Sequence, residues 1–227
     1  MKLAAILLAR VAAWVEVEEL TPQNQVGRVR LSEGLRERYS FLKAPQTLEE
    51  FDVQKDGIQF QSGRHHDIVI ERLVFYMKGI VVETRSSTTD CEKVLADLVA
   101  WIQEQAGVSE AVRIIRTIYL SQLTFYSDRS LELVNSRLGH LANWLSDRIT
   151  EGMRTRLEYG VIGIHFGFDE LTYQLSPGRL VIERRADAPF SENKYFSAAP
   201  LRTEDHLEFL RRFEAVLGET VESPQRS

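Results

Sequence analysis

Two short stretches constrain the fold most, because both are typical of the same kind of β-strand. Residues 68–72 read IVIER and residues 180–184 read LVIER, so each run of apolar, mostly β-branched residues ends in Glu-Arg. Such runs favour strands. Each run is followed by irregular chain and then by a predicted helix. A threonine, Thr89 or Thr203, lies at the start of that helix, and acidic residues lie in the first turn of the helix. This order predicts two related halves, with an internal duplication as their origin.

The remaining β pattern surrounds these two strands. Apolar and polar residues alternate on both sides of a turn at Lys78-Gly79, which predicts a three-stranded meander. A long run of β-branched and aromatic residues opens the second half of the chain. The predicted strands cover residues 8–19, 58–61, 68–76, 80–85, 114–126, 160–168 and 179–185, with a Ser-Pro-Gly turn at 176–178 between the last two.

Helices are predicted where apolar residues recur every three or four positions. The clearest such stripe contains Leu131, Val134, Leu138, Leu141, Leu145 and Ile149. Similar stripes follow the caps at Thr89 and Thr203, and a shorter helix is expected from Ser32 to Tyr39. Residues 21–28 are expected to form a loop because they contain Pro, Asn and Gly.

These elements predict an α+β protein with mainly antiparallel sheets and about three long amphipathic helices packed on one face. The N-terminal half is expected to span 1–108 and the C-terminal half 109–218, with one compact domain as the alternative. Residues 219–227 are polar and lack periodicity, so they are expected to form a flexible tail.

Composition and charge bear on the cellular compartment of the chain and on its possible partners. The 227 residues carry a net charge of −5 and a single cysteine, Cys91, which fits a reducing cytoplasm. Its place on an apolar helix stripe predicts a buried, inert thiol. No apolar run reaches the length of a membrane helix, and Arg10 interrupts the N-terminal apolar run too early for a signal peptide. The acidic balance disfavours nucleic-acid binding, although Arg supplies 22 of the 28 basic residues and leaves an Arg-lined groove as an alternative.

His165 is the most unusual polar residue in a predicted strand. Glycines two positions before and after it, Gly163 and Gly167, clear space beside the imidazole. One interpretation is a weak catalytic candidate, and the other is a histidine that is hydrogen-bonded under a covering helix. Residues 65–67, His-His-Asp, could supply metal ligands, but they fall where a turn is expected and form no recognised ligand motif.

Residues 189–200, PFSENKYFSAAP, are expected to form a long loop with a function. Glu192-Asn193-Lys194 resembles half of a metal-dependent nuclease site that Asp169 or Asp187 would complete, with Glu192 and Lys194 as weak catalytic candidates. The preferred interpretation is that aromatic residues of the loop meet a partner or cover a sheet edge. The candidate binding residues are Arg184, Arg185, Phe190, Glu192, Asn193, Lys194, Tyr195 and Phe196, the two arginines being expected as exposed sheet-face charges.

The sequence contains no GxSxG motif and no Gly-rich phosphate loop that opens a helix. We therefore expect a non-catalytic interaction or assembly subunit without a cofactor, which binds a protein partner or itself. Both faces of the 113–127 strand carry apolar residues, so a homodimer is expected to cover that strand and the 189–200 loop. A metal-dependent nuclease or phosphodiesterase, and the Arg-lined nucleic-acid binder, are the alternative functions.

Overall fold

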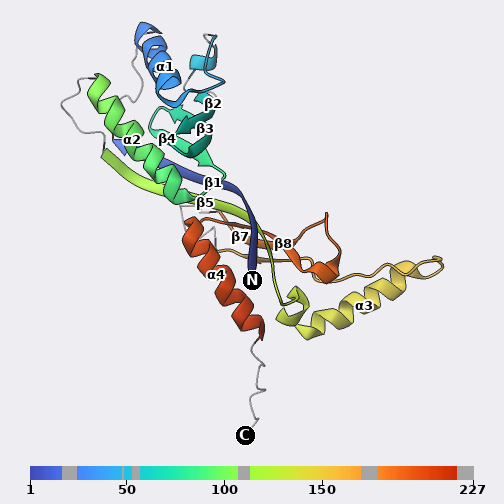
Figure 1. Ribbon diagram of the computed structural model, residues 1–227. Coiled ribbons are helices and arrows are strands. Elements are labelled where there is room, and N and C mark those ends of the chain that lie inside the picture. Colours follow the sequence, from blue (N-terminus) through green and yellow to red (C-terminus); the bar gives the residue numbers. More distant parts are fainter. Residues whose placement is uncertain (17–24, 48, 53–56, 107–112, 170–177, 219–227) are drawn as a thin grey trace.

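The computed structural model describes residues 1–16, 25–47, 49–52, 57–106, 113–169 and 178–218 (Figure 1). Within these residues, eight strands form a single antiparallel sheet with four α-helices, which confirms the expected α+β class. The strands are β1 (Lys2–Glu16), β2 (Ile58–His65), β3 (Ile68–Tyr76), β4 (Gly79–Thr84), β5 (Arg113–Tyr126), β6 (Gly163–Phe166), β7 (Leu180–Arg184) and β8 (Lys194–Ala199). The helices are α1 (Gln25–Tyr39), α2 (Thr88–Ala106), α3 (Ser136–Thr150) and α4 (Thr203–Gly218), with short 3-10 turns η1 (Glu49–Phe51), η2 (Leu131–Val134) and η3 (Phe190–Glu192).

The two halves of the sheet have the same strand order when read outward from its centre. The order is β2-β3-β4-β1-β5-β8-β7-β6, so β1 and β5 are neighbours and each begins one half. Ala9 of β1 pairs with Thr84 of β4 and with Ser121 of β5, and Ser121 in turn pairs with Ala199 of β8. IVIER and LVIER lie on β3 and β7, the corresponding strands of the two halves.

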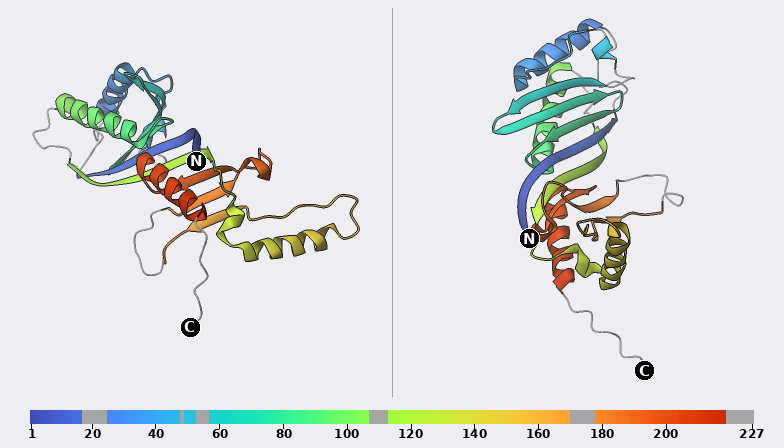
Figure 2. Two further views of the ribbon diagram at one scale, coloured as in Figure 1. Left: turned by 60° about the horizontal axis from the view of Figure 1, so that its bottom comes forward. Right: turned by 90° about the vertical axis from the view of Figure 1, so that its right-hand side faces the viewer.

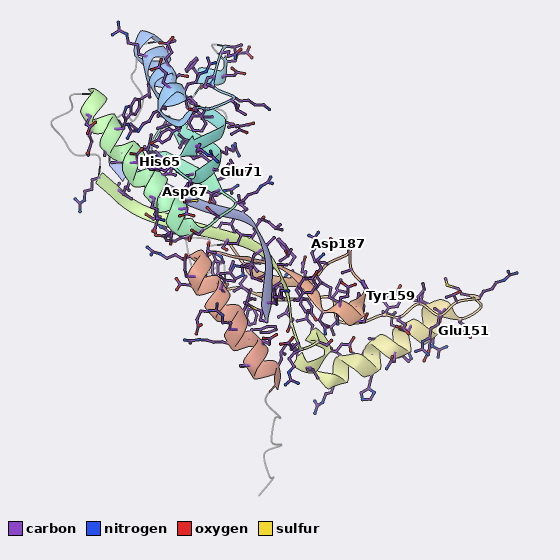
Figure 3. The ribbon with its side chains drawn as sticks, in the orientation of Figure 1. His65, Asp67, Glu71, Glu151, Tyr159 and Asp187 are labelled. Carbon is purple, nitrogen blue, oxygen red and sulfur yellow. The ribbon has the colours of Figure 1, made fainter. Side chains whose placement is uncertain are left out.

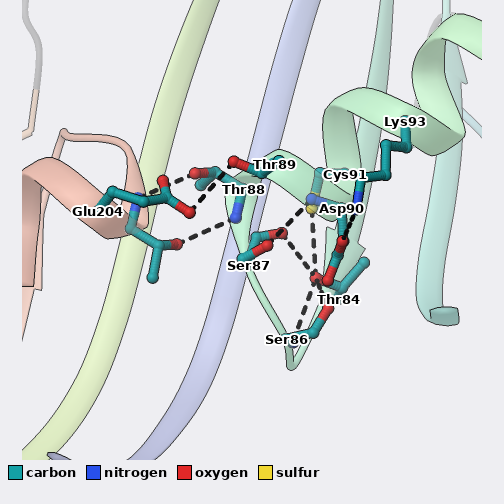
Figure 4. A network of polar contacts seen from close by, with 10 residues as sticks. Thr84, Ser86, Ser87, Thr88, Thr89, Asp90, Cys91, Lys93 and Glu204 are labelled. Atoms are coloured by element: carbon teal, nitrogen blue, oxygen red, sulfur yellow. Dashed lines mark hydrogen bonds and ion pairs between the residues drawn. The ribbon is translucent and has the colours of Figure 1, made fainter.

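The same correspondence extends to the helices that follow β4 and β8. The Thr88 backbone N–H donates to Thr203 Oγ1 at 3.0 Å, and the Thr203 N–H donates to Thr88 Oγ1 at 2.9 Å. Each helix therefore caps the other where a first-turn N–H lacks a partner within its own helix. Thr89 Oγ1 adds a hydrogen bond to Glu204 at 3.1 Å (Figure 4). The same separation of 115 residues relates Thr88 to Thr203, Cys91 to His206 and Leu95 to Leu210.

Helices α1, α2 and α4 lie along one face of the sheet (Figure 2). Among the described residues, the core under α1 and α2 contains 21 buried apolar residues, including Tyr39, Phe60 and Leu98. Under α4 it contains eight, among them Ile182, Tyr195 and Leu210. The second half is thus much less covered than the first. No helix among the described residues is long and apolar enough to cross a membrane.

Several sequence-based expectations were wrong. The strand expected over residues 8–19 begins at Lys2, and the expected loop at 21–28 already contains the start of α1 at Gln25. The 189–200 segment is not one long loop, since Lys194–Ala199 form β8 between β5 and β7. β5 pairs with β1 along its length but with β8 only from Ser121 to Tyr126, and the homodimer expected to cover β5 and the 189–200 segment stays a prediction. The expected border between the halves, the centre of the 176–178 turn and the tail lie outside the described residues.

Candidate functional site

One part of the second half projects away from the sheet. We call residues 131–162 the α3 arm: η2 leads outward into α3, and the chain returns alongside it (Figure 1). Figure 3 shows Glu151 at the far end of α3 and Tyr159 on the returning segment. Helix α3 packs chiefly on η2. The arm therefore leaves most of its surface open to solvent.

Apart from buried Leu131, the stripe that predicted this helix is exposed. Trp144 is 59% exposed, although a helix face of this kind normally lies on a core. Eight further apolar side chains of α3 and the returning segment are also exposed: Leu138, Leu141, Leu145, Ile149, Met153, Leu157, Tyr159 and Ile162. At roughly 100 Å² each, they and Trp144 expose on the order of 900 Å² of apolar residue surface. For comparison, the largest contiguous apolar patch of a typical monomer measures about 300–600 Å².

Arg184, the last residue of LVIER, fixes the base of the arm. Its guanidinium donates to Val161 O at 3.1 Å on the returning segment and to Ser130 Oγ at 2.9 Å before η2. It also donates to Phe190 O at 2.9 Å and lies 4.4 Å from the centre of the Phe190 ring. The side chain is only 5% exposed, which corrects the expectation of an exposed sheet-face charge. Because Arg184 joins the two ends of the arm to β7, it sets the direction in which the arm projects.

Two further contacts stiffen the arm and its base. Buried Ser146 accepts from the Tyr159 N–H at 2.9 Å, which ties the returning segment to α3. Tyr195 of β8 accepts from the Leu131 N–H at 3.2 Å and donates to Asn193 Oδ1 at 3.0 Å. Asn193 has a left-handed backbone with a φ of 46°, a conformation that asparagine tolerates better than most residues. Tyr195 and Asn193, expected as binding residues, thus hold the base of the arm in place.

His165 lies on the sheet face opposite the helices. Its side chain is 52% exposed, and Nε2 lies 3.0 Å from Glu183 Oε1 on the neighbouring strand. The expectation of a covering helix is therefore wrong. Exposed side-chain pairs of this type contribute little to stability.

Of the residues of the nuclease interpretation, Asp187 and Lys194 lie close together, and Asp187 is paired with Arg185. Asp187 accepts two hydrogen bonds from Arg185, at 3.0 and 3.1 Å, and lies 3.5 Å from Lys194 Nζ. The bonds from Arg185 lower the pKa of the Asp187 carboxyl to about 2. Glu192 is exposed in η3, and Phe196 is half-buried in β8. In the described part of the chain, no three His, Cys, Asp or Glu residues form a group that could hold a metal ion.

The predicted turn at residues 65–67 is confirmed. His66 and Asp67 connect β2 to β3, and His66 has a φ of 53°. His65 Nδ1 lies 3.5 Å from Asp97 of α2, so this imidazole packs between two elements of the first half.

Cys91 and His206 occupy corresponding places in the two halves, and both are buried. The Cys91 thiol donates to Ala9 O at 3.3 Å, and burial raises its pKa to about 11. His206 Nε2 lies 2.8 Å from Ser197 Oγ, and burial lowers the pKa of the imidazole to about 4. The sequence analysis predicted the buried thiol but missed His206. The available signal was its place three residues after the Thr203 cap, on the apolar stripe of α4.

Comparisons with known proteins give a structural similarity. The chain matches no protein-family model and no curated protein sequence. Among solved structures it is similar to Methanococcus jannaschii TBP, with 13% sequence identity and a TM-score of 0.46. The match covers 95% of this chain and 98% of that one.

Proposed function

We propose that the protein is a non-catalytic interaction or assembly subunit that works through protein–protein contacts of the α3 arm. The observation that carries this proposal is the exposed apolar surface around Trp144 on an arm that is fixed at its base. A mobile tail with the same residues would lose much conformational entropy on binding, whereas a pinned helix loses less. The arm is thus suited to contact a partner.

A second copy of the chain is the partner that we propose. The apolar surface of one arm is on the order of 900 Å², and a standard interface buries about 800 Å² from each partner. Closed two-fold dimers are the commonest arrangement that covers such a patch on both subunits. The homodimer expected from the sequence is therefore retained, with the arm in place of β5 and the 189–200 segment as its contact.

We also propose that the two halves have a common origin and that the protein is cytoplasmic. The common strand order and the mutual caps of Thr88 and Thr203 support descent of the two halves from one duplicated unit. After such a duplication, the first half keeps helix α1 on the sheet, whereas the second half turns helix α3 outward. The single, buried cysteine supports a cytoplasmic location.

The test is the molar mass of the purified chain as a function of concentration. Light scattering at micromolar concentration should give about twice the 26.1 kDa of one chain. Trp144→Glu should return the mass to one chain, because it places a charge in the apolar contact. Met77→Glu, at an exposed apolar residue of the β3–β4 turn, is the matched control and should remain dimeric. A wild-type chain that stays monomeric, or a dimer that survives Trp144→Glu, would contradict the proposal.

A further inference from the structure

One difference between the two halves concerns the position over the outer strand and beside the long helix. In the first half, α1 fills this position. Its Gly34 lies so close to Trp101 of α2 that an added Cβ would come within 2.8 Å of the indole. Arg38 of the same helix makes two hydrogen bonds to Asp97 of α2, at 2.9 and 2.6 Å. In the second half, α3 has the corresponding place in the order of elements but projects away from α4 (Figure 1).

The outer strands, β2 and β6, show the same difference in how far their side chains are buried. Phe60 of β2 is 1% exposed, whereas Phe166 of β6 is 44% exposed. Phe166 pairs with Leu180 of β7, and residues paired across antiparallel strands lie on the same face of a sheet. Leu180 belongs to the core under α4. Phe166 therefore points to the face that the helices cover, at a place that α4 covers only in part.

The long helices show the same difference. By the separation of 115 residues, Val216 of α4 corresponds to Trp101 of α2. Trp101 is half-buried against α1, whereas Val216 is 62% exposed. Beside it, Phe209 and Phe213 stack at 6.5 Å, and Phe209 meets the edge of Phe166 at 5.6 Å. We call the patch formed by Phe166, Phe209, Phe213 and Val216 the α4 site.

We propose that the α3 helix of one copy occupies the α4 site of a second copy, in the position that α1 holds in the first half, and that the exchange is reciprocal. This inference rests on the proposed function and names the surface that the arm contacts. The occupant has the dimensions of the helix that fills the corresponding site, since α1 and α3 both contain 15 residues. Its apolar stripe supplies the cover that Phe166 and Val216 lack.

A second copy fits better than a return of the arm onto its own sheet. Arg184 binds Val161 and Ser130 together, and this contact holds the two ends of the arm in the outward direction. A return would require these hydrogen bonds to break at a nearly buried guanidinium, whose acceptors would lose their partner. Reciprocal exchange keeps the base intact, covers both arms and both α4 sites, and closes the assembly at two copies.

The test uses the wild-type fold with single cysteines at exposed positions. One preparation carries Leu141→Cys on α3, and the other carries Val216→Cys on α4; native Cys91 is buried and stays unmodified. The two are mixed, allowed to exchange subunits and treated with a short bis-maleimide, whose length tolerates a shift of one helical turn. The mixture should give a cross-linked species of twice the chain mass, and neither preparation alone should give it. Val69→Cys on β3, also exposed, is the matched partner for Leu141→Cys and should give none.

The outcomes separate this inference from the proposed function. Cross-linking of Leu141→Cys with itself would show that two arms pack on one another; the dimer would stand, and occupation of the α4 site would be refuted. A cross-link within one chain of the Leu141→Cys, Val216→Cys double variant would show a return of the arm and would also overturn the exchange. A dimer by light scattering that gives no cross-link in the mixture refutes the exchange alone. A monomer at every concentration refutes both.

Discussion

Replacement of Arg184 by lysine should loosen the base of the α3 arm. The guanidinium donates three hydrogen bonds, to Val161 O, Phe190 O and Ser130 Oγ, from a side chain that is 5% exposed. A lysine ammonium on a single stem cannot reach three oxygens that lie in different directions. If it keeps one bond, two charged hydrogen bonds are lost. At roughly 1.5 kcal/mol each, the free energy of unfolding should fall by about 3 kcal/mol.

Urea unfolding followed by circular dichroism measures this change at one fixed protein concentration. Arg185→Lys is the matched control. Among the described residues its guanidinium pairs with exposed Asp187, so its replacement should change stability by less than about 1 kcal/mol. Amide hydrogen exchange should locate the effect, with faster exchange at Tyr159–Ile162 in Arg184→Lys. If Arg184→Lys unfolds within about 0.5 kcal/mol of wild type and exchange at the arm is unchanged, Arg184 does not hold the arm.

Three further changes probe the core. His206 is neutral in the folded state, and its pKa is lowered from 6.5 to about 4, so protonation of the unfolded chain should cost about 3 kcal/mol of stability as pH falls from 6.5 to 4. Urea titrations at several pH values should show that His206→Gln does not lose this stability as the pH falls. Parallel pH profiles of the variant and the wild type would show that His206 is not the cause. Gly63→Ala places a Cβ 2.4 Å from the Phe41 ring and should lower stability by about 1–3 kcal/mol, whereas an unchanged melting temperature would mean that the ring moves freely. Alanine at Thr88 and at Thr203 should each cost about 1 kcal/mol, and additive losses in the double variant would show that the two caps act independently.

Much of the sheet could be predicted from the sequence, because its periodicity is local. The alternation from Ile58 to Arg85 predicted three strands of the first half, and the apolar run beginning at Ile114 predicted β5. β8 was missed because Lys194–Ala199 contain two alanines and a serine beside two aromatics, and this composition gives a weak strand signal. The β5 and β7 partners that hold β8 lie far away in the sequence, so local propensity could not reveal them.

The candidate site was harder to predict than the fold. The stripe from Leu131 to Ile149 predicted an apolar helix face but could not tell which surface covers it. The role of Arg184 depends on Ser130 and Val161, which reach it only through the folded base of the arm. His165 stood out between two glycines and proved to be an exposed partner of Glu183. An unusual local pattern was thus a poorer guide to the site than an ordinary amphipathic helix.

The central pair of strands also sets the order in which the protein can fold on the ribosome. Ala9 pairs with Thr84 and with Ser121, so β1 leaves the ribosome well before either neighbour has been synthesised. Until β4 and then β5 emerge, the apolar edge of β1 has no native strand to pair with, and such edges recruit other chains. Until β1 and β5 pair with each other, each half of the sheet keeps an unpaired inner edge. Slow translation between Thr84 and Ser121 should therefore favour aggregation, and a nascent-chain binding factor that shields β1 should raise the yield of folded protein.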